Sequence, residues 1–87
     1  MMELITAILN KSKIEEVPVD VAYDMLAVDG DKDALKAAYE ILDKYYVPIT
    51  TLRRAGREAE ITVIIKMAED GADVENYIDE LRKNNII

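Results

Sequence analysis

The chain has 87 residues, 51% of them hydrophobic, and a formal net charge of −7 at pH 7; this is enough apolar material for one small folded domain and too much for a disordered chain. It contains no cysteine and no histidine, which excludes disulfides, thiolate or imidazole metal sites and imidazole general bases. An enzyme would have only carboxylates, Lys, Arg and Tyr to work with, so we expect a non-enzymatic protein without a cofactor or metal.

The first residues predict a short helix. Apolar side chains repeat at helical spacing over residues 2–11. Ser12 and Glu15 then have the spacing of a capping box, in which two side chains accept backbone N–H groups at a helix start. Any helix that begins there must be short, because Pro18 has no N–H to donate in a helix interior.

A second helix is predicted over residues 18–28. Pro18 suits its first position, where no backbone N–H is needed, and Gly30 can adopt the left-handed conformation that ends many helices. Its expected apolar face consists of Val21, Ala22, Met25 and Leu26. The alternation of Val17 and Val19 with Val21 is also typical of a strand, but the residues that follow are better helix formers.

Residues 31–46 show the clearest amphipathic pattern in the chain. On a helical wheel the apolar side chains fall in one arc of roughly 160°. They are Ala34, Leu35, Ala38, Tyr39, Ile41, Leu42, Tyr45 and Tyr46. Asp31 or Asp33 can cap the start, since a carboxylate accepts the backbone N–H groups there. We expect Pro48 to end the helix by keeping the residue before it out of helical geometry, which leaves residues 47–49 extended.

Residues 52–68 predict a further helix, capped by Thr50 or Thr51 and weakened at Gly56. The part from Ile61 to Ala68 is apolar on nearly every side. Such a helix usually lies in the middle of a structure, so we expect this segment to be buried and central.

The β-branched residues at 61–65 leave an alternative open, because they lower helix propensity. In that alternative the fold is α+β, with a small two-stranded element formed by 17–21 and 60–66. We favour the helix, because a strand at 60–66 would have only the weak strand at 17–21 to pair with.

Gly71 interrupts the chain before a last helix, which Asp73 caps. Arg82 and Lys83 in its final turn complement the negative end of the helix dipole. Taken together, the pattern predicts an all-α fold, a compact bundle of four to five short helices in a single domain formed by residues 1–87.

The stretch from Asp29 to Glu40 resembles a calcium-binding EF-hand loop only in part. Acidic residues occupy four ligand positions, but Ala34 stands where the sharp turn of that loop needs glycine. Residues 33–40 also fit the amphipathic helix too well to wrap an ion. We therefore predict a helix cap here and no metal site.

One segment holds most of the negative charge. Residues 69–80 contain six carboxylates and no Lys or Arg, a local charge of −6, which leaves −1 for the other 75 residues. The six are Glu69, Asp70, Asp73, Glu75, Asp79 and Glu80. Closely spaced carboxylates on a helix can imitate the phosphates of a nucleic acid and bind the basic groove of an enzyme, although a solvated helix surface explains the same pattern.

Arg53, Arg54 and Arg57 form the only dense basic cluster. Arginines beside a helix start can bind phosphate or an acidic partner, as in a helix-turn-helix protein. The helix that would read the bases carries Ile, Val and Thr at 61–65 rather than base-reading polar groups, and the domain is acidic. We therefore expect surface ion pairs here rather than direct contact with nucleic acid.

A third surface is suggested by an excess of apolar residues at Tyr45, Tyr46, Ile86 and Ile87, together with the segment 61–68. A small domain with more apolar surface than it can bury often pairs with a copy of itself or with another protein. The tyrosines suit such a surface because the ring is buried while the hydroxyl keeps a polar partner.

We therefore expect a protein-interaction module, a small regulator or adaptor that acts through an apolar patch framed by acidic residues. The alternative is an acidic inhibitor of a nucleic-acid-processing enzyme, of the anti-restriction or anti-CRISPR type, and the third reading is a DNA-binding transcriptional regulator. No apolar run approaches the ~20 residues that span a bilayer. We expect a cytoplasmic protein that binds a protein partner or pairs as a homodimer and does not contact a membrane.

Overall fold

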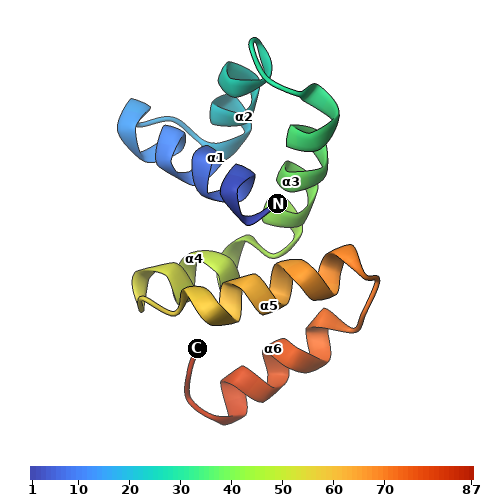
Figure 1. The fold of residues 1–87 in the computed structure, drawn as a ribbon. Helices are drawn as coiled ribbons and strands as arrows, with labels where there is room; N and C mark the ends of the chain where they lie inside the picture. The colour runs from blue at the N-terminus through green and yellow to red at the C-terminus, as the bar shows by residue number, and fades with distance from the viewer. The chain divides into compact units, whose positions relative to one another are not determined.

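The computed structural model describes all residues from 1 to 87, and its regular elements are six α-helices without a strand (Figure 1). The all-α prediction is confirmed, with six helices in place of the four or five expected. The chain divides into two units of three helices, residues 1–44 and 45–87. The two-stranded alternative is wrong, because 60–66 is helical throughout and most of 17–21 lies in a helix.

In the first unit, α1 (Met2–Glu15) continues past residue 11 through the predicted capping box. The Ser12 hydroxyl does not cap a helix start but donates to the carbonyl of Val17. An ion pair between Lys11 and Glu15, 3.2 Å long and four residues apart, lies along the last turn. The capping-box prediction is therefore wrong, since nothing between Asn10 and Glu15 interrupts the helix.

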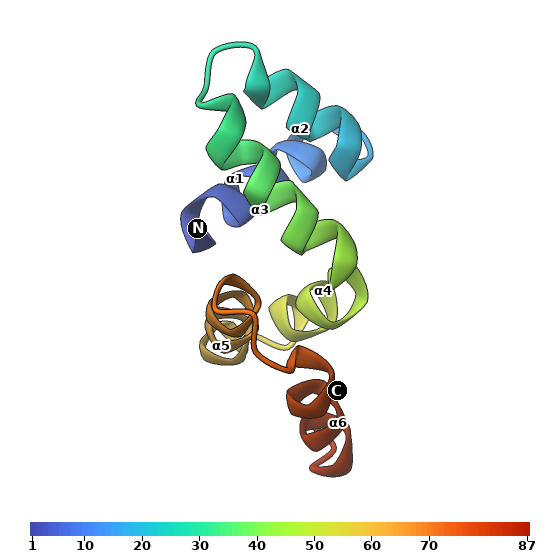
Figure 2. The same cartoon turned by 90° about the vertical axis from the view of Figure 1, so that its right-hand side faces the viewer.

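The predicted second and third helices are present as α2 (Val19–Ala27) and α3 (Lys32–Lys44). Both contact α1 and each other (Figure 2). Pro18 is the residue before α2, and its carbonyl accepts the N–H of Ala22 at 3.0 Å. The start of α3 is capped by Asp31, whose Oδ1 accepts the backbone N–H groups of Asp33 and Ala34 at 3.1 and 3.2 Å.

Gly30 connects α2 to α3 for a reason that differs from the one predicted. Its backbone is not left-handed, because positive φ among the glycines occurs only at Gly56 and Gly71. A Cβ on Gly30 would instead lie 2.9 Å from Cδ1 of Leu35 and 3.0 Å from the carbonyl oxygen of Leu26. Glycine is therefore needed here for space, where the end of α2 passes close to the start of α3.

In the second unit, Pro48 lies inside α4 (Tyr46–Arg54), so the predicted extended segment at 47–49 is wrong. Pro48 is the third helical residue, and the N–H groups of a first turn have no intrahelical acceptor, so none is lost. The first intrahelical bond, from the N–H of Ile49 to the carbonyl of Tyr45 at 3.0 Å, comes after it. Thr50 is also interior to α4, and its hydroxyl donates to the Tyr46 carbonyl at 2.8 Å.

Gly56 separates α4 from α5 (Glu58–Glu69), so the helix predicted over 52–68 is two helices. With φ of 74°, Gly56 adopts a left-handed conformation that other residues rarely take. The helix at 61–68 is confirmed, but its burial on every side is not. Ile61, Ile64 and Ile65 are buried, whereas Val63 is 39% exposed.

The last helix, α6 (Val74–Lys83), follows a second left-handed glycine, Gly71, at φ of 71°. As predicted, Asp73 caps it, with Oδ1 accepting the N–H of Asn76 at 3.2 Å. Its buried side chains are Val74, Ile78 and Leu81. Within this unit α5 contacts both α4 and α6.

The cap at Asp31 gives a first prediction. Asp31→Ala should lower the free energy of unfolding by about 1 kcal/mol, because two backbone N–H groups at the start of α3 lose their acceptor. Asp33→Ala is the matched control, since it removes only a charge from the first turn, worth about 0.3–1 kcal/mol at most. Urea denaturation followed by circular dichroism measures both, and a larger effect of Asp33→Ala would contradict the assignment.

Candidate functional site

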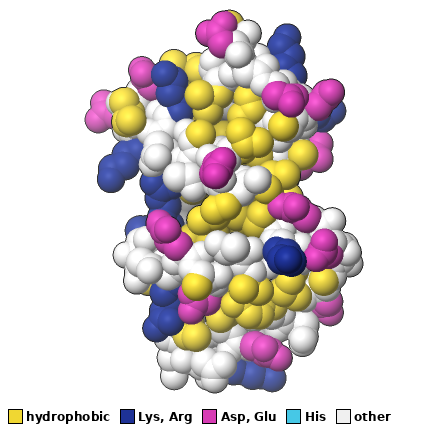
Figure 3. All heavy atoms as spheres, viewed as in Figure 1, with side chains coloured by type: hydrophobic (Ala, Val, Ile, Leu, Met, Phe, Trp, Pro, Cys, Tyr) yellow, Lys and Arg dark blue, Asp and Glu magenta, His cyan; other side chains and the backbone are white.

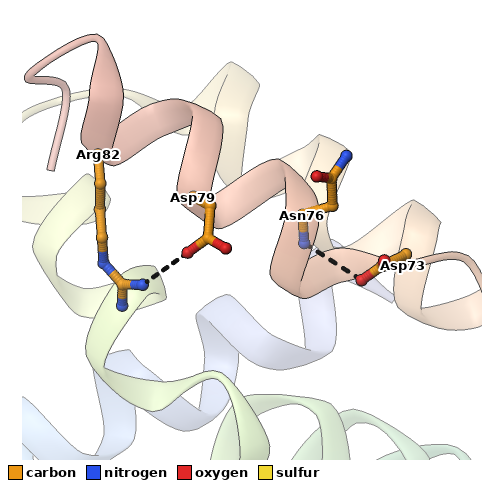
Figure 4. A network of polar contacts seen from close by, with 4 residues as sticks. All are labelled: Asp73, Asn76, Asp79 and Arg82. Carbon is orange, nitrogen blue, oxygen red and sulfur yellow. Dashed lines mark hydrogen bonds and ion pairs between the residues drawn. The ribbon is translucent and has the colours of Figure 1, made fainter.

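The six carboxylates of the acidic segment 69–80 are all exposed, and they extend from the end of α5 along α6. Two of them already have partners in the protein (Figure 4): Asp73 caps α6, and Asp79 Oδ1 lies 3.2 Å from Nη1 of Arg82. Arg82 and Lys83 close the same helix. The negative charge on α6 is thus paired at Asp79 and bordered by positive charge at the end of the helix, unlike a row of phosphates.

Two arginines of the basic cluster, Arg53 and Arg54, end α4, and Arg57 stands just before α5. Nη1 of Arg57 is 3.2 Å from Oε1 of Glu60, as expected from the sequence. In a helix-turn-helix protein the N-terminal residues of the recognition helix approach the bases. Here the first turn of α5 carries Glu58 and Glu60, which would repel phosphate.

The surface at the two tyrosines and the C-terminal isoleucines is smaller than predicted. Tyr45 is buried, and Ile86 and Ile87 are both partly buried. The N–H of Ile86 donates to the carbonyl of Leu81 at 2.9 Å, which holds the end of the chain to α6. Tyr46, 42% exposed, is the member of this group that remains on the surface.

In α2, too, side chains predicted to be buried reach the surface. Only two of its nine residues, Asp20 and Asp24, are polar, yet Ala22 is its only fully buried side chain. Val21 and Met25, predicted to be part of the core, are each 39% exposed, and Val28 at the end of the helix is 74% exposed. We call Val21, Met25 and Val28 the α2 face. Hydrophobic side chains also reach the surface elsewhere, interspersed with charged ones (Figure 3).

The α2 face follows one side of the helix. Its members are four and three residues apart, a spacing that brings side chains together over two helical turns. Isolated exposed apolar residues are ordinary on protein surfaces, but three in register on one helix form a continuous stripe. This stripe is the strongest candidate for a binding surface in the first unit.

Carboxylates lie along one edge of the α2 face. Asp20 and Asp24 are exposed on α2, and neither forms an ion pair with a Lys or Arg side chain. Next to them, the rings of Tyr23 and Tyr39 stack with centroids 4.9 Å apart and planes inclined by 22°. Burial raises the pKa of Tyr39 above 10.0, and the charges of Asp43, Asp20 and Asp24 raise it further. Negative charge from both α2 and α3 therefore surrounds this pair of rings.

The sequence carries a second acidic segment that lies next to this surface. Residues 14–31 also hold six carboxylates without a Lys or Arg. They are Glu15, Glu16, Asp20, Asp24, Asp29 and Asp31. This second acidic segment includes α2, a helix with only two polar residues. The combination indicates an apolar surface bordered by negative charge.

No three acidic side chains come together in a way that could hold a metal ion. None of the six helices has the length and apolar character needed to cross a bilayer. No protein-family model, curated protein or solved structure matches this chain. The function must therefore be inferred from the surfaces described above.

The environment of Tyr39 gives a second prediction. Because its pKa is higher in the folded protein than in the unfolded chain, neutral Tyr39 contributes stability that is complete below pH 10 and is lost as the pH rises through the raised pKa. Tyr39→Phe should make the free energy of unfolding, measured by urea denaturation, fall less steeply as the pH rises above 10.0. Asp43→Asn should reduce the slope only in part, since burial remains. Equal slopes in wild type and Tyr39→Phe would contradict the description.

Proposed function

We propose that the protein is a non-enzymatic protein-interaction module, a small regulator or adaptor that binds its partner through the α2 face. The observation that carries this proposal is the outward position of Val21, Met25 and Val28 on a helix with almost no polar residues. The apolar stripe of a helix is normally covered by a neighbouring element. A partner that covers the α2 face would supply such a neighbour.

The composition supports a role in binding rather than catalysis. With no histidine or cysteine, the chain lacks a thiol nucleophile and an imidazole base that could activate its serine or threonine hydroxyls. The two tyrosines with a raised pKa, Tyr39 and Tyr77, are shifted away from neutral pH, first of all by burial. Such hydroxyls stay protonated and can donate hydrogen bonds, but they are poorly suited to accept a proton during a reaction.

The acidic segment 69–80 supports a second candidate, an inhibitor that occupies the basic groove of a nucleic-acid-processing enzyme. Its six exposed carboxylates favour this candidate. The ion pair of Asp79 with Arg82 and the nearby Lys83 weigh against it, because they place positive charge at one end of the negative surface. We rank this function below the interaction module, and a DNA-binding function below both.

The proposal predicts that Met25→Ser combined with Val28→Ser abolishes binding of the partner without unfolding the protein. Both side chains are exposed, so the free energy of unfolding should change by less than about 1 kcal/mol. The loss of apolar contact should weaken binding at least about tenfold. Affinity capture from the native cell with quantitative mass spectrometry compares the proteins retained by variant and wild type.

The matched control is Val47→Ser combined with Val63→Ser, which removes two exposed apolar side chains from the second unit. Its captured proteins should be the same as those of wild type. If the α2 variant retained every protein that wild type captures, the α2 face would not be the binding surface and the proposal would fail.

The two ranked functions are separated by Glu75→Lys combined with Asp79→Lys. An inhibitor that imitates phosphates should lose its partner after this reversal, and its binding should weaken steeply when salt rises from 0.1 to about 1 M, where the Debye length falls to about 3 Å. An interaction module that uses the α2 face should keep its partner. Binding measured by biolayer interferometry with the captured partner distinguishes the outcomes.

A further inference from the structure

The α2 face is small and has a definite length. From Val21 to Val28 it extends over seven residue steps, about 10 Å along the helix axis. It therefore offers two turns of helix to a partner. Its apolar members at i, i+4 and i+7 have the spacing with which one amphipathic helix packs against another.

The charges around the face restrict what can cover it. Residues 1–44 hold ten acidic and five basic side chains, a net charge of −5. A second copy of the chain would add the same net negative charge and two more carboxylates at Asp20 and Asp24, and like charges at an interface oppose association. A partner with Lys or Arg beside its apolar residues would instead meet two carboxylates that have no cationic partner of their own.

We infer, in an inference that rests on the proposed function, that the partner presents a basic amphipathic helix to the α2 face. Its apolar side chains cover Val21, Met25 and Val28, and its Lys or Arg side chains lie beside Asp20 and Asp24. The contact is short, so the complex belongs to the weak and transient class of protein interactions. Charge then determines which amphipathic helix binds, while apolar burial holds it in place.

A pair of synthetic peptides tests the inference. One is an 18-residue helical peptide with Leu at i, i+4 and i+7 and Lys on both flanks, and the other has Glu in place of each Lys. The full-length protein, labelled with ¹⁵N, is titrated with each peptide and followed by NMR. We expect the Lys peptide to shift the amide signals of residues 20–29 and the Glu peptide to leave them unchanged.

Variants of the protein sharpen the test. Asp20→Asn combined with Asp24→Asn should weaken binding of the Lys peptide roughly three- to tenfold, as expected from the loss of two exposed ion pairs. Met25→Ser should weaken it at least about tenfold. Glu75→Gln combined with Glu80→Gln is the matched control, because it removes the same charge from α6, and it should leave the affinity unchanged.

The inference would be overturned by equal binding of the two peptides, by shifts confined to residues 69–80, or by self-association through the α2 face in sedimentation. It would also be overturned by a cellular partner that is lost with Met25→Ser and Val28→Ser but binds through an acidic or neutral segment. In that last case the proposed function would stand. The proposed function itself would be contradicted by a different result, in which the variant with Met25→Ser and Val28→Ser retains every partner.

Discussion

The protein depends on the burial of narrow aliphatic stripes, because the chain has no Phe or Trp to build a core from larger side chains. In α5 the stripe is Ile61, Ile64 and Ile65, and each such side chain contributes about 1.5–3 kcal/mol when fully buried. A stripe of this width occupies only part of a helix circumference. The rest of the helix surface faces outward. Charged residues there keep the protein in solution, whereas apolar residues there can bind a partner.

Much of the fold follows from the sequence because local and tertiary preferences agree. The helix predicted over 31–46 is present as 32–44, since its apolar arc, its exposed charges and its cap at Asp31 all favour the same structure. The helix around 61–68 is present although β-branched residues lower its propensity by a few tenths of a kcal/mol each. Burial of three isoleucines stabilises the protein by several times more than that loss. Side-chain packing, not local propensity, therefore makes this segment helical.

The wrong predictions concern positions where one residue type is compatible with two different structures. Pro48 ends a helix if it lies in the interior and fits well if it lies in the first turn, and only the position of Tyr45 between α3 and α4 decides between them. Gly30 was expected to supply a left-handed backbone, whereas its role is to leave room beside the backbone carbonyl of Leu26 and the side chain of Leu35. For α2, periodicity predicts a helix but cannot say which side faces inward when most of its residues are apolar.

That ambiguity in α2 is also the best guide to its role. Val28, 74% exposed, adds little to folding, so a polar residue at this position would cost the structure almost nothing. Val21 and Met25, each 39% exposed, have more than half of their surface covered, so folding uses part of each side chain and leaves the rest at the surface. The apolar surface that folding leaves uncovered on α2 is the basis of the proposed binding role, and the exposed carboxylates of Asp20 and Asp24 border it. In the proposed complex their charge would oppose pairing of two identical α2 faces and favour a basic partner, so one pair of side chains would determine both what the surface avoids and what it accepts.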